Sequence, residues 1–142
     1  MMGPVNQRER IDDFLRAGPY AVAGASGDRS KFGNKVLRCY LDNDLVAWPL
    51  NPRAAADGAA IEGVAAYADF ASLPEPVRGV SIVTPPEVTE QLVEAAAAAG
   101  IKRRWMQPGA ESRRAIQRAD ELGLSVIAGG PCVLVELGFP DR

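Results

Sequence analysis

Short apolar runs alternate with helix-forming stretches along this chain, and this alternation limits the folds that the chain can adopt. Five apolar runs are separated by stretches whose apolar residues recur at helical spacing, or by turns rich in glycine and proline. The runs predict strands at residues 20–23, 45–50, 79–83, 104–106 and 125–128. The helical spacing predicts helices at residues 6–17, 34–43, 87–99 and 111–122.

Strands that alternate with helices in this way are typical of parallel βαβ units with right-handed crossovers. The sequence therefore predicts an α/β fold, a three-layer doubly wound parallel sheet of Rossmann-like type, with five strands in the order 3-2-1-4-5. Residues 53–78 are expected to be irregular, with a short edge element at residues 64–67 and a turn of helix at residues 70–73. The 142 residues fit a single domain, with residues 1–19 as an N-terminal helix and lead-in and residues 20–137 as the core.

Composition argues against several classes of function. The formal net charge is −2, from 16 basic and 18 acidic residues, so no general positive surface for nucleic acid or an acidic membrane is expected. The N-terminus has no apolar signal-peptide core and no apolar stretch is long enough to span a membrane, so we expect a cytoplasmic protein. Two cysteines and no histidine argue against a disulfide framework, phosphohistidine chemistry and histidine-dependent triads.

The stretch YAVAGASGDRSKFGNKVLRCYL predicts a strand, a glycine loop and a helix in succession. Proteins bind phosphate at such helix N-termini, although the spacing matches neither G-x-G-x-x-G nor G-x-x-x-x-G-K-[ST]. The helices after the third and fourth strands begin with Glu87 and Glu111, whose carboxylates would repel an anion. The helix after the first strand has no acid in its first turn and lies near Arg29, Lys31 and Lys35. The first loop is therefore the predicted phosphate site.

Ligands of doubly wound sheets bind beyond the carboxyl ends of the strands. All five loops at that edge consist of glycine, proline and a few other, mostly small or polar, residues: Gly24-Ala25-Ser26-Gly27, Asn51-Pro52-Arg53, Thr84-Pro85-Pro86, Gln107-Pro108-Gly109 and Gly129-Gly130-Pro131-Cys132. An NAD site usually has an acid after the second strand, where this chain has Arg53. Because an arginine suits a phosphorylated ribose, NADP and coenzyme A (CoA) both remain alternatives.

The motifs VAGASGDRSKFGNKVLRCYL, WPLNPR, SLPEPV, IVTPPE and WMQPGA, in this order and spacing, resemble the CoA-binding domain family. These are small Rossmann-like proteins similar to the N-terminal domain of the succinyl-CoA synthetase α subunit. The resemblance covers roughly residues 20–137. It implies that the nucleotide phosphates are wrapped by the first glycine loop and the residues after it, namely Gly24, Ala25, Ser26, Gly27, Lys31 and Gly33.

The resemblance also implies roles for the other loops. It places the adenosine end near Asn51, Pro52 and Arg53. It packs the nucleotide against Thr84, Pro85 and Pro86, and it places the pantetheine near Gln107 and Gly109.

The loop after the fifth strand departs from the family pattern. Stand-alone members commonly have D-R-C there, whereas this chain has Gly130-Pro131-Cys132, closer to the G-P-N-C of the synthetase subunit. We include Cys132 among the cofactor-binding candidates, as a partner of the CoA thiol or a redox sensor, with a small buried residue as the alternative. The phosphorylated histidine of the synthetase is absent, so ligase activity is not implied.

No histidine, metal-ligand cluster or other catalytic constellation stands out in the sequence, so we predict no catalytic residue and no metal site. The expected function is non-catalytic binding of CoA or an acyl-CoA, a small-molecule nucleotide. The alternatives are an NADP-binding oxidoreductase-like domain and a nucleotide-binding subunit of a larger ligase or acyltransferase. The acyl group, the pathway and the oligomeric state, either a homo-oligomer or a complex with a larger enzyme, stay open.

Overall fold

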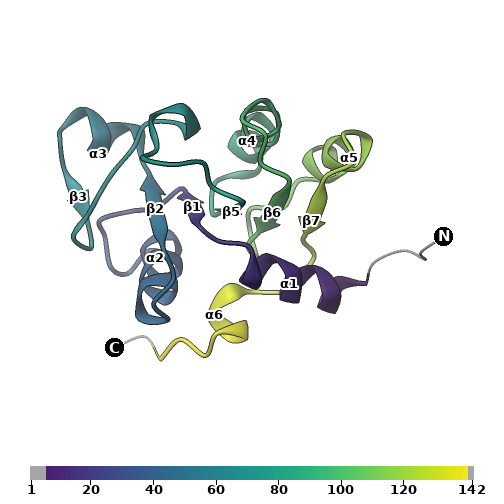
Figure 1. Ribbon diagram of the computed structural model, residues 1–142, viewed down its shortest axis with the longest axis horizontal. Coiled ribbons are helices and arrows are strands. Elements are labelled where there is room, and N and C mark those ends of the chain that lie inside the picture. Colours follow the sequence, from purple (N-terminus) through teal and green to yellow (C-terminus); the bar gives the residue numbers. More distant parts are fainter. Residues whose placement is uncertain (1–5, 141–142) are drawn as a thin grey trace.

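The computed structural model describes residues 6–140 and places a five-stranded parallel sheet between two layers of helices (Figure 1). The sheet strands are β1 (Tyr20–Ala23), β2 (Ala47–Leu50), β5 (Gly79–Ile82), β6 (Arg103–Met106) and β7 (Ser125–Ile127). Helices α4 (Pro86–Ala98) and α5 (Arg113–Glu121) cover one face, and the other face is covered by α1 (Gln7–Arg16), α2 (Phe32–Asp42) and α6 (Val133–Glu136). The predicted doubly wound α/β fold is confirmed, with every predicted sheet strand and helix within two residues of its expected bounds.

The strand order differs from the predicted 3-2-1-4-5. The observed order is β2-β1-β5-β6-β7, so β5, the third of these strands in the chain, lies between β1 and β6 rather than outside β2. The outer edge of β2 is instead occupied by Tyr67, whose N–H donates to Pro49 O at 3.0 Å and whose carbonyl accepts from Asn51 N at 2.9 Å. This pairing covers the end of the outer edge of β2, and β5 forms on the other side of β1.

The segment between β2 and β5 is more ordered than expected. It contains α3 (Pro52–Ala56), an antiparallel hairpin of β3 (Ala60–Ile61) and β4 (Val64–Ala65), and the 3₁₀ turn η1 (Phe70–Ser72). The predicted edge element and turn of helix correspond to β4 and η1. Helix α3 and strand β3 were missed because elements of five and two residues are too short to show a period.

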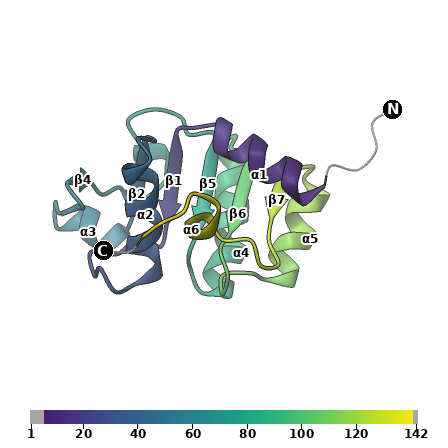
Figure 2. The same cartoon turned by 90° about the horizontal axis from the view of Figure 1, so that it is seen from below.

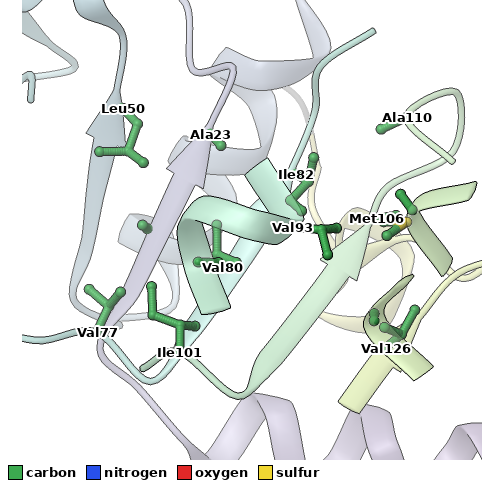
Figure 3. Packing of buried hydrophobic residues seen from close by; sticks show 14 residues of the cluster. Ala23, Leu50, Val77, Val80, Ile82, Val93, Ile101, Met106, Ala110 and Val126 are labelled. Carbon is green, nitrogen blue, oxygen red and sulfur yellow. The ribbon is translucent and has the colours of Figure 1, made fainter. Parts of the chain in front are cut away.

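The strands of the sheet are buried on both faces, which explains their short, continuous apolar runs. On one face, Val93 of α4 packs near Val80 and Ile82 of β5 (Figure 3). On the other face, the ring of Tyr20 stacks on Phe14 of α1 and on Tyr40 of α2, with centroid distances of 5.1 and 4.8 Å. Side chains of α1, α2 and α4 thus fix the helices against the sheet and hold its carboxyl edge in place.

The free edge of β7 is covered by α1, which runs beside it (Figure 2). Gln7 Nε2 donates to Ala128 O at 2.7 Å, and Arg10 Nη1 donates to Val126 O at 3.0 Å. These contacts occupy carbonyls that would otherwise be open to pairing with another strand. Within residues 6–140, no helix combines the length and the apolar character needed to cross a bilayer.

Candidate functional site

A cavity of about 420 Å³ opens where β1 and β2 end. Gly24 and Ala25 line it from the loop after β1, Asn51 and Pro52 from the loop after β2, and Thr84 from the loop after β5. The remaining wall comes from the C-terminal ends of β1 and β2, from α4 and from residues 68–70. Figure 3 shows Ala23 and Leu50 side by side at the strand ends that form its floor. The structure therefore brings together five of the predicted site residues at the carboxyl edge of the sheet.

A second cavity, of about 450 Å³, lies between α2 and the C-terminal segment. It is lined by Arg29, Arg38, Asp42 and Glu62, so charges of both signs meet there. The lining contains none of the site residues that the sequence predicted within the part of the chain that the structure describes. The cavity at the strand ends is therefore the stronger candidate for the ligand site.

Two glycines of the first loop have a packing role. Gly24 has a φ of 91°, and a Cβ there would lie 2.4 Å from Val83 O. A Cβ on Gly33 would lie 2.1 Å from Gly24 O, so α2 touches the end of β1 at this point. Gly27 differs, because a Cβ there would meet no atom of residues 6–140 within 4 Å. Gly27 is therefore the glycine of this loop that faces open space.

The N-terminus of α2 carries neither a cap nor an acid. Lys31 occupies the N-cap position without a side-chain cap hydrogen bond, and the first turn has no acidic residue among those described. By contrast, Asn6, Asn51 and Ser112 accept a backbone N–H at the starts of α1, α3 and α5. Among the described residues, no side chain of α2 itself therefore caps the N–H groups at the start of the helix, although the carboxylate of Glu62 contacts Asn34 of its first turn.

The rest of the first loop is fixed by its own side chains. Ser26 Oγ accepts from Asp28 N at 3.0 Å. The carboxylate of Asp28 accepts from both the hydroxyl and the N–H of Ser30, at 2.7 and 2.9 Å, and these hydrogen bonds hold the pKa of Asp28 below its usual value. Residues 26–30 of the loop are thus linked to one another by side-chain hydrogen bonds.

A carboxylate from the β3–β4 hairpin also reaches this loop. The buried Asn34 donates through Nδ2 to Ser26 O at 2.8 Å and to Glu62 Oε2 at 3.1 Å. The same Glu62 oxygen lies 3.6 Å from Arg29 Nε. Sequence reasoning found Asp28 as the nearby acid and missed Glu62, because a contact across 28 residues leaves no local signal.

The loop after β2 joins the loop after β1 through Asn51. Its Oδ1 accepts from Ala54 N at 2.9 Å, capping α3, and its Nδ2 donates to Ala25 O at 2.9 Å. Pro52 faces the cavity, whereas Arg53 is exposed on α3 and forms no side-chain hydrogen bond or ion pair with residues 6–140. Arg53 is therefore an unpaired cation beside the cavity and not part of its wall.

After β5, the hydroxyl of Thr84 pairs with that of Thr89 at 2.9 Å. Pro85 and Pro86 start α4 and are exposed.

The residues predicted for the pantetheine side lie away from the cavity. Gln107 is fully buried, and its Oε1 accepts from Val133 N at 3.0 Å, while its Nε2 has no partner in the described part of the chain. Gly109 is exposed and donates its N–H to Glu111 Oε1 at 2.7 Å. Cys132 is a half-buried free thiol just before α6. None of the three predicted residues is among those that line the cavity in the described chain.

A family model described as "CoA binding domain" matches residues 19–138. This chain belongs to the CoA-binding domain family. The resemblance that the sequence motifs indicated is thereby confirmed.

Solved structures of similar proteins agree with this membership. A conserved hypothetical protein from Pyrococcus furiosus is 34% identical, with a TM-score of 0.74 over 82% of this chain and 97% of its own. A protein from Thermus thermophilus is 27% identical, with a TM-score of 0.82 over 93% and 96% of the two chains. The dinucleotide-forming acetyl-coenzyme A synthetase 1 of Ca. Korarchaeum cryptofilum shares the fold at 24% identity and a TM-score of 0.66, over 80% of this chain and 26% of its own. No curated protein matches the chain.

In this member of the CoA-binding domain family, part of the cavity wall was not predicted from the sequence. Residues 68–70 reach the cavity because the chain folds back along β2, and no sequence pattern signals that return. The part of the cavity wall that comes from α4 could have been predicted from the sequence. Its residues Val88, Leu92 and Ala95 recur at helical spacing and so share one face of the helix. Among residues 6–140, no group of histidine, cysteine and acidic residues is arranged to hold a metal ion.

Proposed function

We propose that this protein binds CoA or an acyl-CoA without catalysing its conversion. The observation that carries the proposal is the position of the cavity, which lies between strand ends and opens beside the uncapped start of α2. In doubly wound sheets, nucleotides bind at the point where neighbouring strands send their connections to opposite faces. Here that point lies between β1, which leads to α2, and β5, which leads to α4. Membership of the CoA-binding domain family supports the same ligand.

The residues present fit the parts of CoA. The volume and apolar walls of the cavity suit a purine ring. The diphosphate would lie at the start of α2, beside Ser26, Gly27 and Lys31, where backbone N–H groups and the helix dipole favour an anion. The exposed guanidinium of Arg53, next to Pro52 of the cavity wall, would meet the 3′-phosphate.

The pantetheine would leave the cavity past Thr84, Pro85 and Pro86 toward the end of β6. The unpaired Nε2 of Gln107 supports this direction, because a buried amide without a partner is costly and an amide carbonyl of pantetheine would satisfy it. Gly109 and the Cys132 thiol lie at the same end and are the proposed neighbours of the CoA thiol.

Calorimetric titration of the ligand-stripped protein with CoA, acetyl-CoA, NADP and NAD in parallel tests the proposal. We expect binding of CoA and acetyl-CoA and none of NADP or NAD, with acetyl-CoA recovered unchanged after prolonged incubation. Binding of NADP alone would favour an oxidoreductase-like domain. Hydrolysis or transfer of the acetyl group would contradict the non-catalytic role. If none of the four ligands binds, the remaining alternative is that the protein is a subunit of a larger enzyme. Pull-down from lysate would then detect the partner.

A further inference from the structure

Arg38 of α2 is a charged residue with only 6% of its surface exposed, and it joins the C-terminal segment to the loop after β1. Its Nε donates to Asn34 Oδ1 at 2.7 Å, and its Nη2 donates to Arg29 O at 3.0 Å. Its Cζ lies 5.2 Å from the centre of the Phe139 ring, a distance at which an aromatic face attracts a cation. A change at Phe139 can therefore reach the loop through a single side chain.

Two backbone carbonyls of the loop after β1 are held by side chains of α2. Arg38 binds the carbonyl of Arg29, and the buried Asn34 donates through Nδ2 to Ser26 O at 2.8 Å. The two contacts support each other, because Oδ1 of Asn34 accepts from Arg38 and so keeps Nδ2 turned toward Ser26. Since Gly27 lies between these carbonyls in the sequence, Arg38 and Asn34 together set the position of the backbone at which the diphosphate is proposed to bind.

The end of α6 places Phe139 over the guanidinium. Gly138 has a φ of 71°, in the region that favours glycine, and the chain turns back there so that Phe139 N donates to Leu134 O at 2.8 Å. The ring is half-buried, and Phe139, Arg29 and Arg38 line the same cavity of about 450 Å³. Loss of the ring would therefore widen this cavity and admit water to the guanidinium.

We infer that Phe139 is a positioning residue for the diphosphate site and acts through Arg38. With the ring in place, the cation is stacked and its N–H groups stay aimed at Asn34 and Arg29. Without the ring, water competes for these N–H groups, and the loop samples positions that do not suit the anion. The apparent affinity then falls in proportion to the fraction of molecules that hold the competent position. This inference rests on the proposed function, because it places a diphosphate at this loop.

The test compares Phe139→Tyr, which keeps an aromatic face, with Phe139→Leu, which keeps an apolar side chain without one. Both variants are titrated calorimetrically with CoA and with ADP, which share a diphosphate. We expect Phe139→Tyr to bind both ligands within about 2-fold of wild type, and Phe139→Leu to bind both about 5-fold more weakly. The midpoints of urea denaturation should be similar for the two variants. Val135→Ala, which shortens an exposed side chain of α6, is the control and should change neither affinity.

Action through Arg38 has readouts of its own. In an Arg38→Met background, Phe139→Leu should weaken CoA no further, because no cation remains for the ring to hold. In ligand-free protein, NMR should show the Nε–H of Arg38, which is hydrogen-bonded to Asn34, exchanging with water faster in Phe139→Leu than in Phe139→Tyr. This exchange is measured without any ligand and does not require Arg38→Met to fold.

Each failure has a distinct meaning. Wild-type affinity of Phe139→Leu for CoA overturns the inference and leaves the proposed function standing. Equal weakening by Phe139→Tyr and Phe139→Leu also overturns it, since that is the result expected of a merely structural cover. Unchanged exchange of the Arg38 Nε–H in Phe139→Leu, or a further loss of affinity in the Arg38→Met background, overturns the action through Arg38. If ADP binds and is weakened by Phe139→Leu but CoA does not bind, the inference stands and the proposed ligand is wrong. If neither ligand binds to the wild type, both are wrong.

Discussion

The loops that follow β1 and β6 look alike in sequence but are arranged differently. Each leaves a buried strand at the carboxyl edge, contains a glycine in the left-handed region and leads into a helix, with φ of 91° at Gly24 and 93° at Gly109. At the loop after β6, the start of α5 is capped by Ser112, and Glu111 accepts the N–H of Gly109. At the loop after β1, the start of α2 has no side-chain cap within residues 6–140.

Glycine content alone therefore does not distinguish a binding loop from an ordinary turn. The β6 loop satisfies its backbone donors with its own side chains, and so has little to offer an anion. The β1 loop uses Gly24 and Gly33 to bring β1, β5 and α2 close together, and leaves the helix start open beside a cavity.

Replacing Gly33 with alanine should have the largest effect on folding. The new Cβ would lie 2.1 Å from Gly24 O, a backbone atom that cannot move without shifting β1 or α2. We expect the free energy of unfolding to fall by about 4 kcal/mol, measured by urea denaturation. The matched change in the other loop, Gly109→Ala, meets no atom of residues 6–140 within 4 Å. Gly109→Ala should lower the free energy of unfolding by only about 1 kcal/mol, because alanine is disfavoured in the left-handed backbone conformation of residue 109. If Gly33→Ala and Gly109→Ala lowered the free energy of unfolding equally, the two loops would be packed alike.

Replacing Gly27 with valine should affect binding rather than folding. The side chain would project into open space and so leave the free energy of unfolding within about 0.5 kcal/mol of wild type. It would, however, occupy the space in which the proposed diphosphate approaches the backbone. We expect CoA affinity to fall by at least about 100-fold, or 2.7 kcal/mol, in calorimetric titration. Unchanged affinity in the folded variant would remove the β1 loop from the site.

Replacing Arg53 with alanine separates the two phosphate positions of CoA. If its guanidinium contacts the 3′-phosphate, CoA should weaken by about 1.5–3 kcal/mol while dephospho-CoA changes little. The matched control is Arg113→Ala, which removes an exposed arginine at the start of α5, after the β6 loop. This variant should change the affinity for neither CoA nor dephospho-CoA. An equal loss on both ligands would mean that Arg53 does not contact the 3′-phosphate.

The sequence predicted the fold where local patterns carry the information. The apolar run at residues 20–23 and the Pro-start, Gly-end signature of α4 were sufficient to place these elements. The position of β5 was not predictable in the same way, because its pairing with β1 is a contact between segments far apart in the chain and leaves no local pattern. Asp69 reaches the cavity wall by the return of the chain along β2, which no local sequence pattern signals.

Exchanging the capping patterns of the two loops should give the smallest effects, and the most specific ones. Ser112→Ala removes the cap of α5 and should lower the free energy of unfolding by about 1 kcal/mol without changing CoA affinity. Lys31→Ser adds a cap to α2 and should raise the free energy of unfolding of the ligand-free protein by about 1 kcal/mol over Lys31→Ala, which removes the same charge without supplying a cap. The serine hydroxyl would then accept an N–H that the proposed diphosphate uses, so CoA should bind more weakly to Lys31→Ser than to Lys31→Ala. Equal affinities of these two variants would show that the open donors at the start of α2 do not bind the phosphates, and that the contrast between the loops concerns folding alone.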